Sequence, residues 1–351
     1  MVSRTKKMLV GLLASIVGFS VITVGSAIIA YESMFQRVER PNYDFMAGEY
    51  CYQRIAERLP RQELYYQANS TKLKGYYYES LQKKGLVVIV HGMNAGADDY
   101  LPMIEYMVNA GYNVFAYDCT GTYDSEGKDT VGMCQQLVDL DGTIEYLKQN
   151  PVFQEMPLFL IGHSWGGYAC ASVLSLTAEV KACATISAMH NAPDIIVEKA
   201  KEYVGDLSKM PAPAFDIYQR LLFKDYVDCN TVKGINARNI PILVAHGETD
   251  KKILFNKQSI IAFKDKIKNP NVQYYIGKDS QGDHCNIWHS KEAAAYQKTV
   301  KAQLKQLKKS KGDAFTNEDK RTFYRTVDHA LYSEVNQDLM NQIVTMFDNA
   351  L

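Results

Sequence analysis

The sequence lacks an excess of charge of either sign and lacks closely paired metal-binding side chains. It has 351 residues, in which 39 Lys and Arg are balanced by 39 Asp and Glu. Nucleic-acid-binding proteins usually carry a basic excess, so this balance gives no reason to expect nucleic acid as a partner. Seven Cys and seven His include no CxxC or HxxxH pair, and the odd, scattered Cys do not suggest a disulfide framework. We therefore expect neither a metal nor an organic cofactor.

Long hydrophobic runs are also scarce, and the longest uncharged stretch lies near the N-terminus. Residues 9–30 carry no charge and follow three basic residues. A helix of about 20 apolar residues crosses a bilayer, whereas the apolar region of a cleaved signal peptide is about 7–15 residues long. We predict a signal-anchor transmembrane helix within residues 1–30, with a cleaved signal or a buried helix as alternatives. The slight basic excess before the stretch predicts a single-pass membrane protein whose main domain is extracytoplasmic.

Apolar runs alternate with helical stretches along most of the chain. The apolar, β-branched run at 86–92 is typical of a strand that is covered on both faces. We expect the strands at about 64–68, 73–80, 86–92, 112–118, 157–164, 180–187, 240–247 and 272–277. We expect the intervening helices at about 100–111, 133–149, 165–176, 253–267 and 288–309. This alternation predicts an α/β fold with a mostly parallel central sheet and helices on both faces.

The predicted strands and helices divide the chain into four regions. Residues 31–60 read as a polar tether, and 61–309 as the α/β domain. Within that domain, about 188–236 form an insertion between two strands. Residues 310–351 form a C-terminal extension whose apolar residues have helical spacing, which favours amphipathic helices packed on the domain.

One glycine-flanked serine stands between a predicted strand and a predicted helix. Gly162-His163-Ser164-Trp165-Gly166 fits G-x-S-x-G, a motif that counts when it joins a strand to a helix. Glycines leave room for neighbouring backbone at so sharp a turn. The serine would lie at a helix N-terminus, where free N–H groups favour a developing anion. We interpret Ser164 as a nucleophile and Gly162 and Gly166 as the turn that holds it.

A serine hydroxyl needs a base and an orienting acid before it can attack a carbonyl. His284 lies in the loop after the last predicted strand, whereas His289 falls on the following helix, so we favour His284 as the base. Glu248 and Asp250 both follow the strand at 240–247, and Asp250 reaches further beyond its end. We therefore predict Asp250 as the acid.

The other histidines have less suitable positions. We expect His91 to order the loop after its strand, and the side chain of His163 to point away from the adjacent serine. We place His246 within or at the end of a strand. His190 and His329 fall in the insertion and the tail, where we expect surface positions.

The order of Ser164, Asp250 and His284 after a parallel strand resembles the α/β-hydrolase superfamily. The resemblance covers about 65–308. Residues 90–127, "VHGMNAGADDYLPMIEYMVNAGYNVFAYDCTGTYDSEG", are similar to the branch of serine aminopeptidase-like hydrolases and monoacylglycerol lipases or lysophospholipases.

The resemblance implies an oxyanion hole and a cap in addition to the fold. The oxyanion hole would consist of the backbone N–H groups of Met93 and Trp165. The insertion at 188–236 would be a helical cap that excludes water from the site.

These features predict a membrane-tethered serine hydrolase with a Ser-His-Asp triad. The expected substrate is a small-molecule carboxylic ester, such as an acyl ester or lysophospholipid. An amidase or aminopeptidase with the same triad is one alternative. A non-catalytic, membrane-anchored binding protein is the second.

Overall fold

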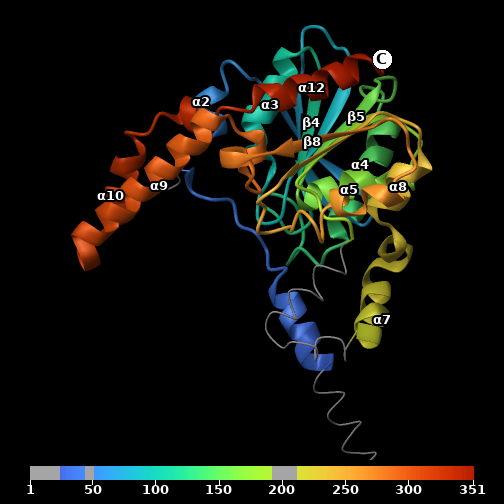
Figure 1. Cartoon of the computed structure of the whole chain (residues 1–351), viewed down its shortest axis with the longest axis horizontal. Helices are drawn as coiled ribbons and strands as arrows, with labels where there is room; N and C mark the ends of the chain where they lie inside the picture. Colours follow the sequence, from blue (N-terminus) through green and yellow to red (C-terminus); the bar gives the residue numbers. More distant parts are fainter. Residues whose placement is uncertain (1–23, 44–50, 192–211) are drawn as a thin grey trace, which may run out of the picture.

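An eight-stranded sheet forms the centre of the computed structural model, which describes residues 24–43, 51–191 and 212–351 (Figure 1). The strand order is β1-β2-β4-β3-β5-β6-β7-β8. The strands are β1 Gln62–Ala68, β2 Thr71–Tyr78, β3 Leu86–Val90, β4 Asn113–Asp118, β5 Leu158–His163, β6 Val180–Ile186, β7 Ile242–Gly247 and β8 Val272–Gly277. The hairpin β1-β2 and the pair β2-β4 are antiparallel, and the other neighbouring strands are parallel. The predicted α/β fold with a mostly parallel sheet is confirmed.

Helices connect the parallel strands and cover both faces of the sheet (Figure 1). The α-helices of the described chain include α2 Tyr52–Ile55, α3 Leu101–Asn109, α4 Gln135–Gln149, α5 Trp165–Val173, α7 Ala212–Phe223, α8 Thr231–Ala237, α9 Lys291–Lys311, α10 Asn317–Tyr324, α11 His329–Tyr332 and α12 Gln337–Asp348. In Figure 1, α9 and α10 extend to one side of the sheet, and α12 lies across it.

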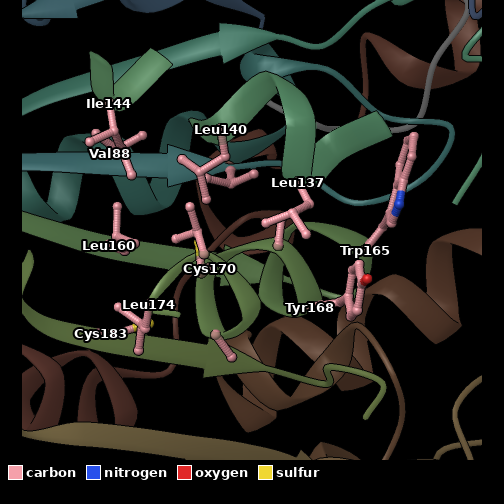
Figure 2. Close-up of a cluster of buried hydrophobic side chains, with 14 of the residues drawn as sticks. Val88, Leu137, Leu140, Ile144, Leu160, Trp165, Tyr168, Cys170, Leu174 and Cys183 are labelled. Carbon is pink, nitrogen blue, oxygen red and sulfur yellow. The ribbon is translucent and has the colours of Figure 1, made fainter. Parts of the chain in front are cut away.

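One face of the sheet packs against α4 and α5, and α8 packs on α5. Figure 2 shows Leu140 of α4 close to Val88 and Leu160 of the sheet, with Cys170 of α5 beside them. Cys170 and Cys183 are fully buried in this layer, so they serve as small apolar core residues. The close packing of α5 fixes its first residue above the carboxyl ends of the strands.

The other face packs against α3 and the C-terminal helix α12. Leu339 and Ile343 of α12 are fully buried, in agreement with their helical spacing in the sequence. Phe347 stacks on Phe159 of β5 with ring centroids 4.7 Å apart. Because α12 covers central strands, the C-terminal extension is part of the hydrophobic core.

The segment predicted as a helix at 253–267 has a different structure. Turns extend through Gln258, and the regular part is a 3₁₀ helix at Ile260–Lys266 with non-helical dihedral angles at Phe263. Ser259 caps this helix by accepting from the amide of Ala262. With Ser259 as its N-cap, the helical segment begins at residue 260 and not at 253. The spacing of the apolar residues alone does not indicate this later start.

The segment predicted as a polar tether contacts the domain along part of its length. Residues 24–33 are helical, and Tyr31 and Phe35 are buried in the core. The rings of Phe35 and Trp165 have centroids 6.4 Å apart, so this segment lies against the start of α5. The charged residues of this segment suggest a solvent-exposed tether, but the side chains of Tyr31 and Phe35 pack into the core and attach the segment to the domain.

Two predictions fall partly on residues outside the described ranges. The predicted transmembrane helix and its orientation depend largely on residues 1–23, and the predicted cap includes 192–211. Among the described residues, no helix has both the length and the apolar character needed to cross a bilayer. The described part of the predicted cap includes α7 and α8.

Candidate active site

Ser164 occupies a strained turn between β5 and α5. Its backbone has φ 56° and ψ −115°, a region that L-residues seldom adopt. A Cβ on Gly162 would lie 2.3 Å from the carbonyl oxygen of Gly166, and a Cβ on Gly166 would lie 2.1 Å from that of Val90. Both positions therefore require glycine, because α5 begins in direct contact with the backbone of the sheet. The predicted strand–turn–helix context of the serine is present.

The structure brings Ser164, His284 and Asp250 together from three separate loops. Oγ of Ser164 lies 2.9 Å from Nε2 of His284, and Nδ1 of His284 lies 2.6 Å from Oδ2 of Asp250. Since an ionised carboxylate only accepts hydrogen bonds, Nδ1 carries the proton, and Nε2 is free to accept from the serine. His284 and Asp250 are both buried, whereas Ser164 is partly accessible. This arrangement can deprotonate a hydroxyl as it attacks a carbonyl.

Hydrogen bonds fix the carboxylate of Asp250 on both oxygens. Oδ1 accepts from the amides of Lys252, at 2.7 Å, and Ile253, at 3.0 Å. Nε2 of His246, in β7, lies 3.2 Å from Oδ2. Burial alone would raise the pKa of Asp250, but hydrogen bonds from His246, His284 and the Ile253 amide outweigh it and hold the pKa well below its usual value. The group therefore stays ionised beside the imidazole.

The two amides predicted for an oxyanion hole lie in segments next to the serine. Trp165 is the first residue of α5, so its N–H has no acceptor within the helix. Met93 follows Gly92, where an added Cβ would lie 3.4 Å from Cβ of Ser164. The loop after β3 thus passes directly beside the candidate nucleophile. The role of both amides stays a prediction.

The unused histidines of the site have structural partners. Nδ1 of His91 lies 2.8 Å from the carbonyl oxygen of Gly92, and its Nε2 accepts from the amide of Cys119, so His91 orders the loop after β3. His163 bonds to Tyr100 and to the carbonyl oxygen of His284. The position of His91 agrees with the expectation from the sequence.

The acid and base that we did not favour lie elsewhere. Glu248 is exposed to solvent at the end of β7. His289 does not lie on the helix as expected, because it precedes α9 and its ring is 3.8 Å from that of Trp288. Neither residue joins the group around Ser164.

Sequence reasoning missed two participants, His246 and Tyr100. His246 was placed correctly on a strand, and its spacing of four residues from Asp250 was the available signal. The sequence indicates Tyr100 only as part of a helical stretch. Nothing in the local sequence indicates that its hydroxyl reaches His163, which is 63 positions away.

The sheet order, the turn at Ser164 and the loops that carry His284 and Asp250 define the class of this protein. It has the α/β-hydrolase fold. Its residues 82–233 match the model of the family described as serine aminopeptidase, S33.

Curated relatives and solved structures agree with this class. The chain is 25% identical over 190 residues to a lysophosphatidylserine lipase, ABHD12, of Danio rerio, a match that spans 51% of this chain and 47% of the relative. It is 22% identical over 213 residues to an uncharacterised protein, YfhR, of Salmonella typhi, spanning 60% of this chain and 68% of that one. The structure of the Pyrococcus furiosus esterase Pf2001 superimposes with a TM-score of 0.54 and 20% identity, covering 79% of this chain and 98% of the esterase.

Proposed function

We propose that this protein is a serine esterase that hydrolyses carboxylic esters through an acyl-enzyme. The observation that carries the proposal is the continuous set of contacts from Ser164 through His284 to Asp250. These contacts have the distances, and the proton on Nδ1, that general-base activation of a serine requires.

The proposed mechanism has two half-reactions. Oγ of Ser164 attacks the ester carbonyl while Nε2 of His284 takes its proton, and the Asp250 carboxylate stabilises the imidazolium. The amides of Met93 and Trp165 donate to the tetrahedral oxyanion. His284 then returns the proton to the departing alkoxide, which leaves Ser164 acylated. Water, deprotonated by His284, attacks the carbonyl of the acyl-enzyme, and His284 then gives this proton to the departing Oγ of Ser164 as the acid is released.

An acyl ester or a lysophospholipid is the proposed substrate class. The lipase named among the relatives and the esterase fold both favour ester substrates.

Steady-state hydrolysis of p-nitrophenyl esters of increasing acyl length tests the proposal. We expect turnover by the wild type and none by Ser164→Ala above the rate in buffer. Turnover that is the same in both proteins would contradict it.

Amide hydrolysis is the second candidate, because the matching family is described as serine aminopeptidase. An aminoacyl p-nitroanilide and the p-nitrophenyl ester of the same acyl group compare the two directly. A higher kcat/KM on the anilide would favour the amidase, and the opposite order would favour the esterase.

We further propose that the uncharged stretch at 9–30 anchors the protein in a membrane with the catalytic domain outside the cytoplasm. Its length and the basic residues before it support this location. Carbonate extraction of membranes and protease accessibility of the domain in intact cells test it. Release of the full-length chain by carbonate would count against an anchor.

A further inference from the structure

A second histidine, His163, joins three parts of the candidate active site through its ring. Its Nδ1 lies 2.7 Å from the hydroxyl of Tyr100, and its Nε2 lies 3.0 Å from the backbone carbonyl oxygen of His284. The Tyr100 hydroxyl also accepts from the amide of Gly92, at 3.0 Å. The contacts thus run from the loop after β3, through the residue before the nucleophile, to the backbone of the base.

The direction of each hydrogen bond follows from its partners. A carbonyl oxygen only accepts, so Nε2 of His163 must carry a proton. Burial, and next the nearby charge of His284, lower the pKa of His163 to about 3, so the ring is neutral at pH 7. Nδ1 therefore has a lone pair and accepts from the Tyr100 hydroxyl. The tyrosine thus selects the tautomer that donates to His284.

Burial and ring packing hold this chain of hydrogen bonds in place. Tyr100 and His163 are 4% and 6% exposed. The ring of Trp288, just after the loop of His284, stacks on Tyr100 with centroids 5.8 Å apart. It also lies edge-on to His163 at 6.4 Å. Neither ring has space to rotate to another partner without disturbing this packing.

We infer that Tyr100 and His163 are positioning residues that hold the backbone of His284 at the distance at which its Nε2 meets the Ser164 hydroxyl. This inference rests on the proposed serine-esterase function and deepens it. The same hydroxyl fixes Gly92, where an added Cβ would lie 3.4 Å from Cβ of Ser164, so one tyrosine aligns the base and the loop predicted to bind the oxyanion. A displacement of about 1 Å in such a group can reduce the rate about 100-fold.

Three substitutions separate positioning from simple stabilisation. Tyr100→Phe removes the hydroxyl that selects the tautomer. His163→Asn keeps a polar group near the position of Nδ1 but is too short to reach the His284 carbonyl. His163→Gln can place an amide N–H near the position of Nε2. Tyr66→Phe is the matched control, because the buried Tyr66 hydroxyl bonds to Thr143, at 2.8 Å, away from this chain of contacts.

The experiment measures kcat, KM and Tm for the full-length protein on a p-nitrophenyl ester that the wild type hydrolyses. We expect kcat to fall about 10- to 100-fold in Tyr100→Phe and His163→Asn, with KM changed less than about threefold. We expect His163→Gln to recover most of the loss, and Tyr66→Phe to lower Tm without changing kcat.

Two results would contradict the positioning role of Tyr100 and His163, and a third would contradict the proposed esterase function. Tyr100→Phe and His163→Asn with wild-type kcat and a lowered Tm would show a purely structural role. Equal losses in His163→Gln and His163→Asn would show that the bond to His284 is not what matters. A folded wild type that neither hydrolyses esters nor reacts with a fluorophosphonate would instead remove the proposed function, and the inference with it.

Discussion

Nε2 of His246 lies 3.2 Å from Oδ2 of Asp250, the same oxygen that Nδ1 of His284 approaches at 2.6 Å. The carboxylate therefore stands between two imidazoles. Nε2 of His246 also lies 2.9 Å from the carbonyl oxygen of Ile253, and because that oxygen only accepts, this nitrogen carries the proton. Asp250 consequently receives a hydrogen bond from His284 on Oδ2, with the N–H of His246 pointing to Ile253 but close to the same oxygen, and accepts backbone amides on Oδ1.

Replacing Asp250 by Asn tests the role of this carboxylate. We expect kcat to fall about 10³- to 10⁴-fold, because an amide can stabilise the wrong His284 tautomer and cannot stabilise the imidazolium. Steady-state kinetics on an ester substrate measure the effect. Glu248→Gln, on the exposed acid after the same strand, is the control that should retain wild-type kcat. Comparable losses in the two variants would contradict the assignment of Asp250.

The positive φ of Ser164 leads to a prediction about stability. Because φ 56° is strained for any residue with a Cβ, Ser164→Gly should be more stable than Ser164→Ala by about 1 kcal/mol. Both variants should lack esterase activity. Denaturant unfolding of the pair measures the difference, and an alanine variant as stable as the glycine variant would argue against strain at this turn.

Gly166 should tolerate no side chain. A Cβ there would lie 2.1 Å from the carbonyl oxygen of Val90, so Gly166→Ala must push α5 away from β3. We expect a loss of about 3 kcal/mol in the free energy of unfolding, together with loss of activity. Gly25→Ala is the comparison, since no atom lies within 4 Å of an added Cβ at that position. A fully active, equally stable Gly166→Ala protein would be inconsistent with the described turn.

The sequence contained enough information to predict the sheet and to select the residues around Ser164. Alternating apolar runs and loops located β3, β4, β5, β6 and β7 within a few residues, because buried parallel strands need continuous apolar side chains. The positions of Asp250 and His284 after strands were sufficient because the carboxyl ends of parallel strands meet at one edge.

Contacts that depend on three-dimensional packing could not be predicted in this way. The bond between Tyr100 and His163 depends on how α3 and β5 pack, and on a tautomer that is set by a third residue. The contact of Phe35 with Trp165 was also missed, because the segment around Phe35 is rich in charge and local composition suggested solvent. In both cases the two residues in contact are far apart in the sequence, so a local sequence pattern cannot predict the contact.

Acid should destabilise the protein partly through His163. The unfolded chain takes up a proton on this ring near its ordinary pKa of about 6.5, whereas the folded protein does so only at about 3. The free energy of unfolding therefore falls as pH drops below about 6.5, and at pH 5 the contribution of this ring is a loss of about 2 kcal/mol.

The comparison with His163→Gln isolates this effect, because the other titrating groups are common to both proteins. Between pH 7.5 and pH 5, the wild type should lose about 2 kcal/mol more stability than the variant in chemical denaturation. Equal pH dependence of the two proteins would show that His163 takes up its proton normally in the folded state.

The central claim is that Ser164 is an activated nucleophile, and covalent labelling tests it most directly. A fluorophosphonate reacts with an activated serine without requiring the natural substrate, and intact mass with peptide mapping locates the adduct. We predict one adduct, on Ser164, in the wild-type protein. We predict none in Ser164→Ala and a labelling rate at least about 100-fold lower in His284→Ala, because the hydroxyl then has no base. A folded wild-type protein that remains unlabelled, or that labels equally without His284, would contradict the account.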